Sequence, residues 1–114
     1  YNMNAAQQST IAILQGRLTE LQKARNNYKH VLLGTGHLVR VGPVYLKFTI
    51  TSERLVTDSV NCTVESADLF VQEDAEAIAK TITNGHNEKG QAVHVTDAIE
   101  EEIAMVEKLL TTIS

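Results

Sequence analysis

Four histidines and a single cysteine are the side chains of this 114-residue chain with the most obvious capacity for chemistry. The histidines stand far apart, at His30, His37, His86 and His94. No His-x-x-x-His spacing and no cysteine pair is present, so no zinc motif can be read from the sequence. If His37 and His94 lie on neighbouring strands they are candidates for a shared metal site, and otherwise they are ordinary residues of a sheet surface. We predict no metal and no cofactor.

Cys62 is the one thiol, so the chain has no internal disulfide, and this favours a reducing compartment. It alternates with Val60 and Val64, as an inward-facing strand residue does. No basic neighbour in the sequence would activate it, so we interpret it as a buried structural thiol rather than a nucleophile. Glu100-Glu101-Glu102 point in different directions around a helix, which predicts a solvated face and not a pair of catalytic carboxylates. The sequence therefore predicts no catalytic residue and no enzyme, although an unrecognised site is left open.

Positive charge interleaved with tyrosine is the pattern that an anionic, base-containing ligand requires, because the charge takes phosphate and the ring stacks on the base. The candidate ligand-binding residues are Arg25, Tyr28, Lys29, Arg40, Tyr45 and Lys47. In the alternative interpretation, Tyr28 is a packing residue and Arg25 sets the register of a helix pair. Gly34-Thr35-Gly36 is not a phosphate loop, because a helix precedes it and no Gly-Lys-Ser/Thr follows.

A long helix must position the first of these residues. Apolar side chains recur in a heptad-like 3-4 pattern that also includes Arg25, at Ile11, Leu14, Leu18, Leu21, Arg25, Tyr28 and Leu32. The pattern predicts a helix from Asn4 or Ser9 to Leu33, closed by the glycines that follow. A seam of this kind favours a partner helix. We therefore predict a homodimer or higher oligomer whose interface holds Ile11, Leu14, Leu18, Leu21 and Tyr28.

The rest of the chain predicts an α+β fold in a single domain, 1–114. A β-meander over 37–65 follows the long helix of 1–33, with strands at 37–41 and 44–50 around Gly42-Pro43. Segments 54–57 and 60–65 are either two further strands or one bent strand. A short helix over 73–83 and a final strand over 91–95 occupy 66–95, and a C-terminal helix capped by Asp97 fills 96–114. The antiparallel sheet is thus expected to have four to five strands.

Composition and charge bound the function. Apolar residues make up 43% of the chain and charged residues 21%, which is typical of a globular protein, and no apolar run reaches the ~20 residues that a membrane span needs. We expect a cytoplasmic protein. The net charge of −4 does not favour nucleic acid. Residues 1–60 carry +4 and residues 61–114 carry −8. This asymmetry either helps the two halves, or two subunits, to meet, or leaves a basic concavity for an anion.

The segment Val60-Asn-Cys-Thr-Val-Glu-Ser-Ala-Asp-Leu-Phe-Val-Gln-Glu-Asp-Ala-Glu-Ala-Ile-Ala resembles a strand-to-helix unit of small phage and mobile-element accessory proteins. The matching positions are Leu69, Phe70, Glu73, Asp74, Ala75, Ile78 and Ala79. The sequence departs from the pattern at Val71, where a hydroxyl residue that caps the helix is expected. The resemblance implies a phage-type origin and a role in host takeover or counter-defence, and it transfers no functional residue.

Three functions are consistent with these observations. The first is a non-enzymatic oligomeric interaction protein that binds and inhibits or regulates a host macromolecule. The second is an oligomeric sponge or sensor that holds a nucleotide-like anion between subunits. The third is an enzyme with an unrecognised site. The first is the function that we predict.

Overall fold

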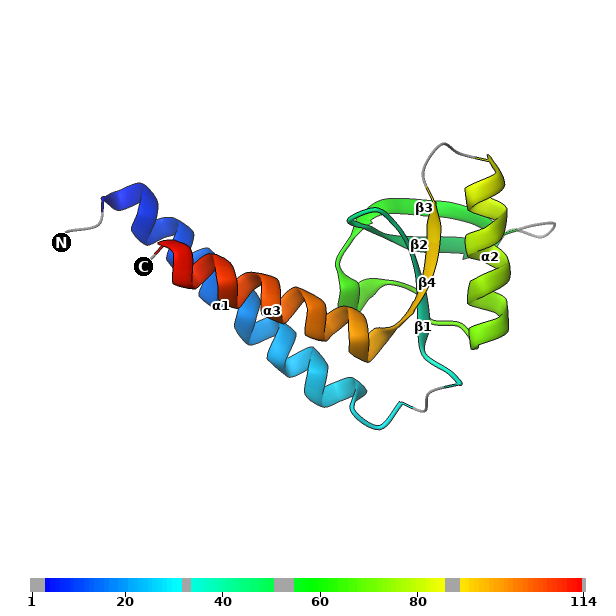
Figure 1. The fold of residues 1–114 in the computed structure, drawn as a ribbon, viewed down its shortest axis with the longest axis horizontal. Helices are drawn as coiled ribbons and strands as arrows, with labels where there is room; N and C mark the ends of the chain where they lie inside the picture. The colour runs from blue at the N-terminus through cyan, green and yellow to red at the C-terminus, as the bar shows by residue number, and fades with distance from the viewer. Residues whose placement is uncertain (1–3, 32–33, 51–54, 86–88, 114) are drawn as a thin grey trace.

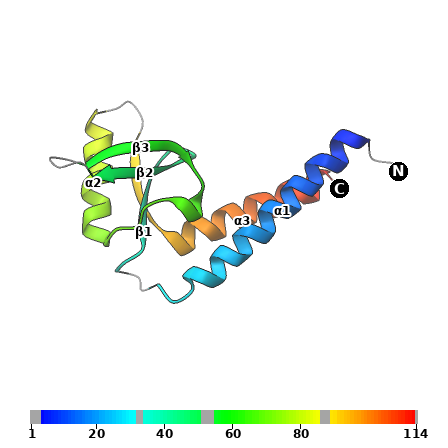
Figure 2. The same cartoon turned by 180° about the vertical axis from the view of Figure 1, so that it is seen from behind.

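The structure, a computed structural model, describes residues 4–31, 34–50, 55–85 and 89–113. The molecule is elongated, with extents of 57 × 32 × 23 Å, and it has two parts (Figure 1). Two long helices form an arm, which we call the helical hairpin. A sheet with one further helix forms the α/β unit at the other end of the molecule. The first and last described residues lie together at the free tip of the hairpin (Figures 1 and 2).

The predicted α+β class is confirmed. The described residues form, in chain order, α1 (Ala5–Tyr28), β1 (His37–Val41), β2 (Val44–Ile50), β3 (Leu55–Cys62), the 3-10 turn η1 (Val64–Ser66), α2 (Gln72–Gly85), β4 (Gly90–His94) and α3 (Val95–Ile113). Within this part of the chain, no helix is both long and apolar enough to cross a bilayer.

α1 begins where its capping residue predicts. The Asn4 side chain accepts a hydrogen bond of 2.8 Å from the N–H of Gln7, and Gln7 Oε1 accepts one of 3.1 Å from the N–H of Asn4. These bonds satisfy backbone donors that the first turn of a helix leaves free. The start at Asn4 was one of the two that the sequence allowed.

The predicted end of α1 at Leu33 is wrong, because the helix ends at Tyr28. The N–H of Val31 closes a turn onto the carbonyl of Tyr28 at 3.0 Å. The Val31 side chain then lies directly against Gly36, so closely that a Cβ atom on Gly36 would collide with it. Gly36 also has φ +68°, a conformation that favours glycine. The chain leaves the helix early because it must make this contact before it enters β1.

The strands form one antiparallel sheet with the order β3-β2-β1-β4. Gly42, at φ +57°, turns the chain between β1 and β2. Of the two possibilities for 54–65, the structure has a single strand, β3, that ends at Cys62, while Val64 and Glu65 belong to η1. Arg54 lies outside the described residues. β4, the last strand in the sequence, pairs with β1, the first, and is therefore an outer strand of the sheet.

α3 begins at Val95, so the predicted cap at Asp97 is wrong. The strand runs directly into the helix, because the N–H of Val95 still bonds to the carbonyl of Gly36 at 2.9 Å. His94 Nδ1 lies 3.3 Å from the N–H of Thr96 and accepts its hydrogen bond, which is the role expected of a cap. Asp97 lies in the first turn, where its negative charge is still favourable. The structure also places β4 one residue earlier than predicted and extends α2 to Gln72–Gly85.

Two apolar clusters hold the fold, one on each face of the sheet. Leu38 and Val39 alternate along β1 and are both fully buried. Leu38 belongs to the cluster that joins the sheet to α1 and α3, and Val39 belongs to the cluster under α2. Successive residues of a strand point to opposite faces, so β1 connects both clusters. α2 covers one face, and the base of the hairpin covers part of the other (Figure 2).

Candidate functional site

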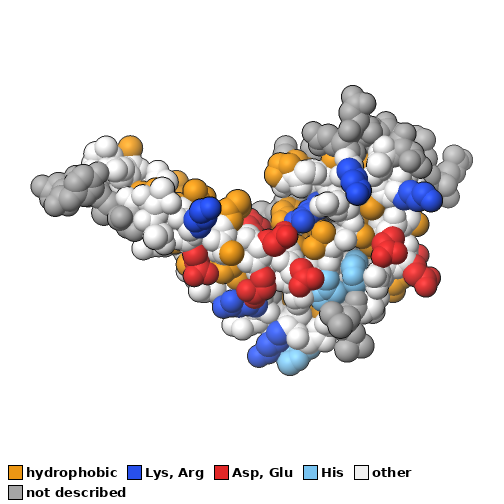
Figure 3. Space-filling view, in the orientation of Figure 1, with side chains coloured by type: hydrophobic (Ala, Val, Ile, Leu, Met, Phe, Trp, Pro, Cys, Tyr) orange, Lys and Arg blue, Asp and Glu red, His pale blue; other side chains and the backbone are white. Residues whose placement is uncertain are grey.

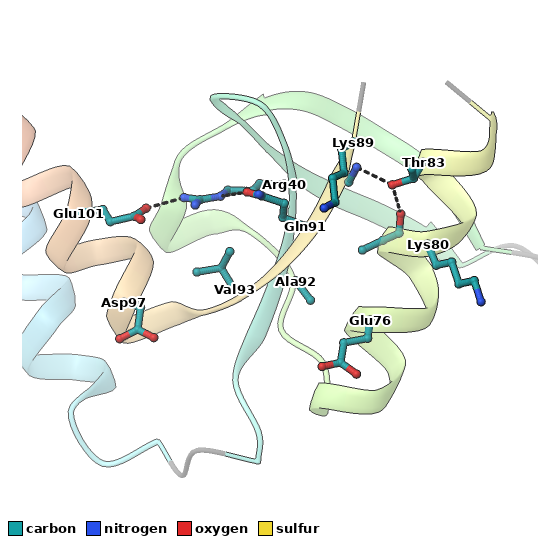
Figure 4. A pocket seen from close by; sticks show the side chains of 12 residues that line it. Arg40, Glu76, Lys80, Thr83, Lys89, Gln91, Ala92, Val93, Asp97 and Glu101 are labelled. Carbon is teal, nitrogen blue, oxygen red and sulfur yellow. Dashed lines mark hydrogen bonds and ion pairs between the residues drawn. The ribbon is translucent and has the colours of Figure 1, made fainter. Parts of the chain in front are cut away.

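A groove runs along the outer strand β4, between α2 and α3, and we call it the β4 groove (Figure 4). Its volume is about 770 Å³. The lining residues come from α2 (Glu76, Ala79, Lys80, Thr83), from β4 and the residue before it (Lys89, Gly90, Gln91, Ala92, Val93), from α3 (Asp97, Glu101) and from β1 (Arg40). Segments far apart in the sequence therefore build one surface around an outer strand.

The hydrogen bonds of β4 establish which of its backbone groups face the groove. The N–H of Val95 bonds to β1's neighbour Gly36, and Val93 and Gln91 are opposite Leu38 and Arg40. In the other direction, the N–H of Gly90 donates to Thr83 of α2. Antiparallel pairing alternates these directions along the strand. Ala92 therefore directs its N–H and C=O away from β1, toward the open edge.

Gly90 is a glycine for a local reason. A Cβ atom at this position would lie 2.6 Å from the carbonyl oxygen of Ala79 in α2. Thr83 Oγ1 accepts the N–H of Gly90 at 2.8 Å and donates to the same Ala79 carbonyl at 3.0 Å. The absence of a side chain at Gly90 thus allows α2 to approach β4, and α2 forms one wall of the groove.

Arg40 crosses from the sheet to α3 at the opposite wall. Its Nη1 lies 2.6 Å from Glu101 Oε2, and its Nε donates to Gln91 at 3.2 Å (Figure 4). The hydrogen bond from Arg40 lowers the pKa of Glu101, and the same bond raises the pKa of Arg40. Burial raises the pKa of Tyr45, the cross-strand partner of Arg40. This wall is therefore a paired, nearly neutral contact rather than a free cationic site.

The charges that remain in the β4 groove are polarised along the strand. Lys89 precedes β4, and Lys80 lies on α2 on the side of Thr83, which contacts the start of the strand. Asp97 follows β4, and Glu76 lies one helical turn before Lys80 (Figure 4). All four side chains are exposed. The groove is basic where β4 begins and acidic where it ends.

The six residues predicted to bind an anion are divided between the helical hairpin and the sheet. Arg25, Tyr28 and Lys29 lie on or just after α1, and Arg40, Tyr45 and Lys47 lie on the sheet. Arg25 forms an ion pair with Glu100 at 3.4 Å, and Arg40 forms one with Glu101. Both arginines are therefore paired with carboxylates of α3. Tyr28 donates to the carbonyl of Glu65 at 3.3 Å. The structure brings Arg40 and Tyr45 together, and the nucleotide-like ligand stays a prediction.

The predicted oligomer interface packs inside its own chain. Leu21 is fully buried, and Leu14, Leu18 and Tyr28 pack against the cluster that includes Ile99, Ile103 and Val106 of α3. Ile11 is half-buried. The seam residues therefore have a partner helix in α3 and do not require a second subunit to be buried. Self-association itself stays a prediction.

The structure confirms that Glu100 and Glu101 are exposed to solvent, and it corrects this interpretation for Glu102, most of whose side chain is buried. The three carboxylates point in different directions, as predicted, and each pairs with a different arginine, namely Arg25, Arg40 and Arg17. Acidic side chains gather where the hairpin meets the α/β unit (Figure 3). The run therefore joins α3 to α1 and to β1.

Arg17 is the centre of this junction, and sequence reasoning missed it. Its Nη1 and Nη2 lie 2.6 and 2.9 Å from the two carboxylate oxygens of Glu65, and Nη2 lies 3.1 Å from Glu102. Burial acts to raise the pKa of Glu65, but the hydrogen bonds and charge of Arg17 help to hold it below its usual value. A two-pronged contact of this kind fixes geometry as well as charge. Its role is to hold η1 to the hairpin.

The two candidate metal ligands are cross-strand partners, His37 on β1 and His94 on β4. Their ring centroids are 5.1 Å apart in an edge-to-face arrangement. They are not surface residues, since only 8% and 5% of their areas are exposed. Among the residues that the structure describes, no group of three His, Cys, Asp or Glu is arranged to hold a metal ion.

Cys62 is half-buried rather than fully buried. Its Sγ donates to the carbonyl of Tyr45 at 3.1 Å, and burial raises its pKa. A raised pKa keeps the thiol protonated and unreactive. These observations agree with a structural thiol.

Comparison of the chain with protein-family models, with curated proteins and with solved structures found no match.

Proposed function

We propose that this chain is a non-enzymatic interaction protein that binds another polypeptide by strand addition at β4. The observation that carries the proposal is the outward-facing N–H and C=O of Ala92 at the floor of the β4 groove. An unpaired strand edge offers hydrogen bonds to any extended segment, and the walls beside it supply specificity.

The side chains around the groove support binding rather than catalysis. Among the described residues that line the groove there is no histidine and no cysteine. Their one hydroxyl, on Thr83, is engaged by the carbonyl of Ala79 and the N–H of Gly90. Arg40 and Glu101 neutralise one another. What remains is a strand edge with exposed charges of both signs, which is the surface of a binding site for a polypeptide.

The resemblance of residues 60–79 to phage accessory proteins adds a biological role to this proposal. On that basis the chain, assembled as an oligomer, inhibits or regulates a host macromolecule, as in counter-defence.

Replacing Ala92 by proline tests strand addition. Ala92→Pro removes the outward N–H without touching the bonds that Gln91, Val93 and Val95 make toward β1, and proline is tolerated on edge strands. We expect partner affinity to fall ~10-fold or more, the cost of a lost backbone hydrogen bond and a poorer fit. Ala92→Ser keeps the N–H and a small side chain, so it is the matched control.

The measurement is a pair of readings on each purified complex. Affinity is measured for the parent chain, Ala92→Ser and Ala92→Pro, and amide hydrogen exchange is followed at Ala92 with and without partner. Protection of the Ala92 amide in the complexes of the parent and the serine variant supports strand addition. Equal binding by the proline variant, or an Ala92 amide that stays unprotected, contradicts it.

A further inference from the structure

We infer that the β4 groove is occupied by a second copy of this chain, paired antiparallel with β4 about a two-fold axis at Ala92. The inference rests on the proposed strand addition and names its partner. Two sheets would then continue into one another through their β4 strands. The pairing uses the outward N–H and C=O of Ala92, because the outward N–H of Gly90 is already bonded to Thr83.

The sequence of β4 suits self-pairing. The strand is Gly-Gln-Ala-Val-His and carries no Lys, Arg, Asp, Glu or Pro. Charged residues and proline are the usual protection of an exposed edge, and β4 has neither within its bounds. A two-fold axis at Ala92 sets Gln91 opposite Val93 of the partner subunit. No like charges face each other across the new pair of strands.

The polarity of the groove makes the two copies complementary. The basic end lies at the start of β4, with Lys89 and Lys80, and the acidic end lies beyond it, with Asp97 and Glu76. Antiparallel pairing reverses the second strand. The lysines of each copy therefore face Asp97 of the partner subunit and the partner's Glu76, and the same contacts repeat on the other side of the axis.

A second copy of the chain matches the charges at both ends of the groove by symmetry alone. An unrelated peptide would need an acidic residue at one end, a basic residue at the other, and the correct direction along β4. A two-fold axis supplies both at once, because the same surface is used twice. Opposite charges across such an interface set the register and favour the matching partner.

The strand pair is short, so the expected association is weak. Stable interfaces bury on the order of 1,200–2,000 Å², more than two five-residue strands supply alone. The flanks of α2 and α3 must therefore contribute. We expect a dimer that forms at micromolar concentration and that weakens as salt rises, since its rim is charged.

Two charge-reversal variants test the inference. Lys80→Glu with Lys89→Glu makes the groove predominantly acidic, and Glu76→Lys with Asp97→Lys makes it predominantly basic. All four side chains are exposed, so the cores are untouched. We expect each variant alone to dimerise at least ~10-fold more weakly than the parent chain, and an equimolar mixture to recover a one-to-one dimer. Sedimentation velocity and native mass spectrometry measure both.

A control separates the groove from overall charge. Lys23→Glu with Lys29→Glu changes the net charge by the same amount on exposed positions of the hairpin side. This variant should dimerise as the parent does. If it weakens the dimer as much as the groove variants do, the β4 groove is not the interface.

Three results would overturn the inference. The first is a parent chain that remains monomeric at several hundred micromolar. The second is that both charge-reversal variants dimerise as strongly as the parent chain. The third is that an equimolar mixture of the two variants forms no dimer. A chain that stays single, while a different polypeptide still protects the Ala92 amide, contradicts the second copy and leaves strand addition standing. Loss of that protection as well would remove both proposals.

Discussion

The helical hairpin and the α/β unit differ in what they leave available to a partner: the hairpin buries its apolar stripe, and the α/β unit leaves a strand edge open. The hairpin carries the more conspicuous apolar pattern, yet α1 and α3 bury it against each other, and Leu21 is fully inaccessible. The α/β unit looks unremarkable in sequence, yet its strand order leaves β4 with an open edge. A helix satisfies its own backbone hydrogen bonds, whereas an outer strand cannot. An unpaired backbone, rather than an apolar stripe, therefore marks the surface that is open to a partner.

The two regions also use charge differently. Arg17 closes onto Glu65 and Glu102 with about a fifth of its side chain exposed, and it locks the hairpin to η1. In the β4 groove, Lys80, Lys89 and their acidic counterparts are exposed. The first arrangement completes the fold, and the second is available to another chain.

The largest expected effect lies in the hairpin. Leu21→Ala removes a fully buried side chain between α1 and α3. We expect the free energy of unfolding to fall by ~2–5 kcal/mol, as for other buried leucines. Urea denaturation followed by circular dichroism measures it. Ala92→Ser changes a partly buried side chain that packs against the cluster under α2, and it should cost no more than about 1 kcal/mol. An equal loss at both sites would contradict the comparison.

Arg17→Met should lower the free energy of unfolding by ~1–3 kcal/mol. This is less than for a fully buried ion pair, because the site is partly solvated. The loss comes from leaving the carboxylates of Glu65 and Glu102 unpaired. Adding Glu65→Gln and Glu102→Gln should recover part of it. Arg17→Lys keeps the charge but not the two-pronged contact, so it should lie between the parent and Arg17→Met. A triple variant no more stable than Arg17→Met would show that the carboxylates are not the cause.

Gly90→Ala sharpens the comparison from the side of the groove. The added Cβ would meet the backbone of Ala79 at 2.6 Å, so α2 must move away from β4. We expect a loss of ~1–3 kcal/mol, typical of overpacking. Amide exchange should rise in α2 and β4 and stay unchanged in the helical hairpin. Exchange that rises equally in both parts would show that they unfold as one unit.

Acid should loosen the hairpin junction through Glu65. Its pKa is lowered in the folded chain, so the stabilisation is fully present above the pKa of the unfolded chain and is lost as pH falls through the folded value. Stability should therefore decline below about pH 4.3, the ordinary pKa of Glu. Glu65→Gln should flatten this decline by ~1 kcal/mol. Denaturation midpoints from pH 7 to pH 3 measure it, and an unchanged slope would contradict the assignment.

Gly16→Ala is the smallest effect and has the opposite sign. A Cβ atom at Gly16 meets nothing within 4 Å, and the residue lies inside α1. We expect a gain of ~0.5–1 kcal/mol from helix propensity alone. The midpoint temperature of thermal unfolding should rise. A loss instead would mean that a partner's backbone approaches this glycine.

Local signals account for the parts of the fold that could be predicted. The start of α1 at Asn4 depends on one neighbour, Gln7, which the sequence places within the same turn. The end of α1 depends on the contact between Val31 and Gly36, and the start of α3 depends on His94 and Gly36. These are tertiary contacts, which no pattern along a helix contains.

The site was harder to predict for the same reason. The β4 groove exists because the last strand is placed beside the first, which the sequence does not state. Glu102 was taken as solvated because its partner, Arg17, lies 85 positions away. One signal was present in the sequence: Lys89 and Asp97 bracket an uncharged strand with opposite charges. Its meaning depends on knowing that the strand is an outer one.

The tip of the hairpin has a practical consequence for work on this molecule. Asn4 and Thr112 border the same small cleft there, at the end of the molecule remote from β4 (Figure 1). A fluorophore or surface linker attached at Thr112 leaves both the groove and the Asn4 cap undisturbed.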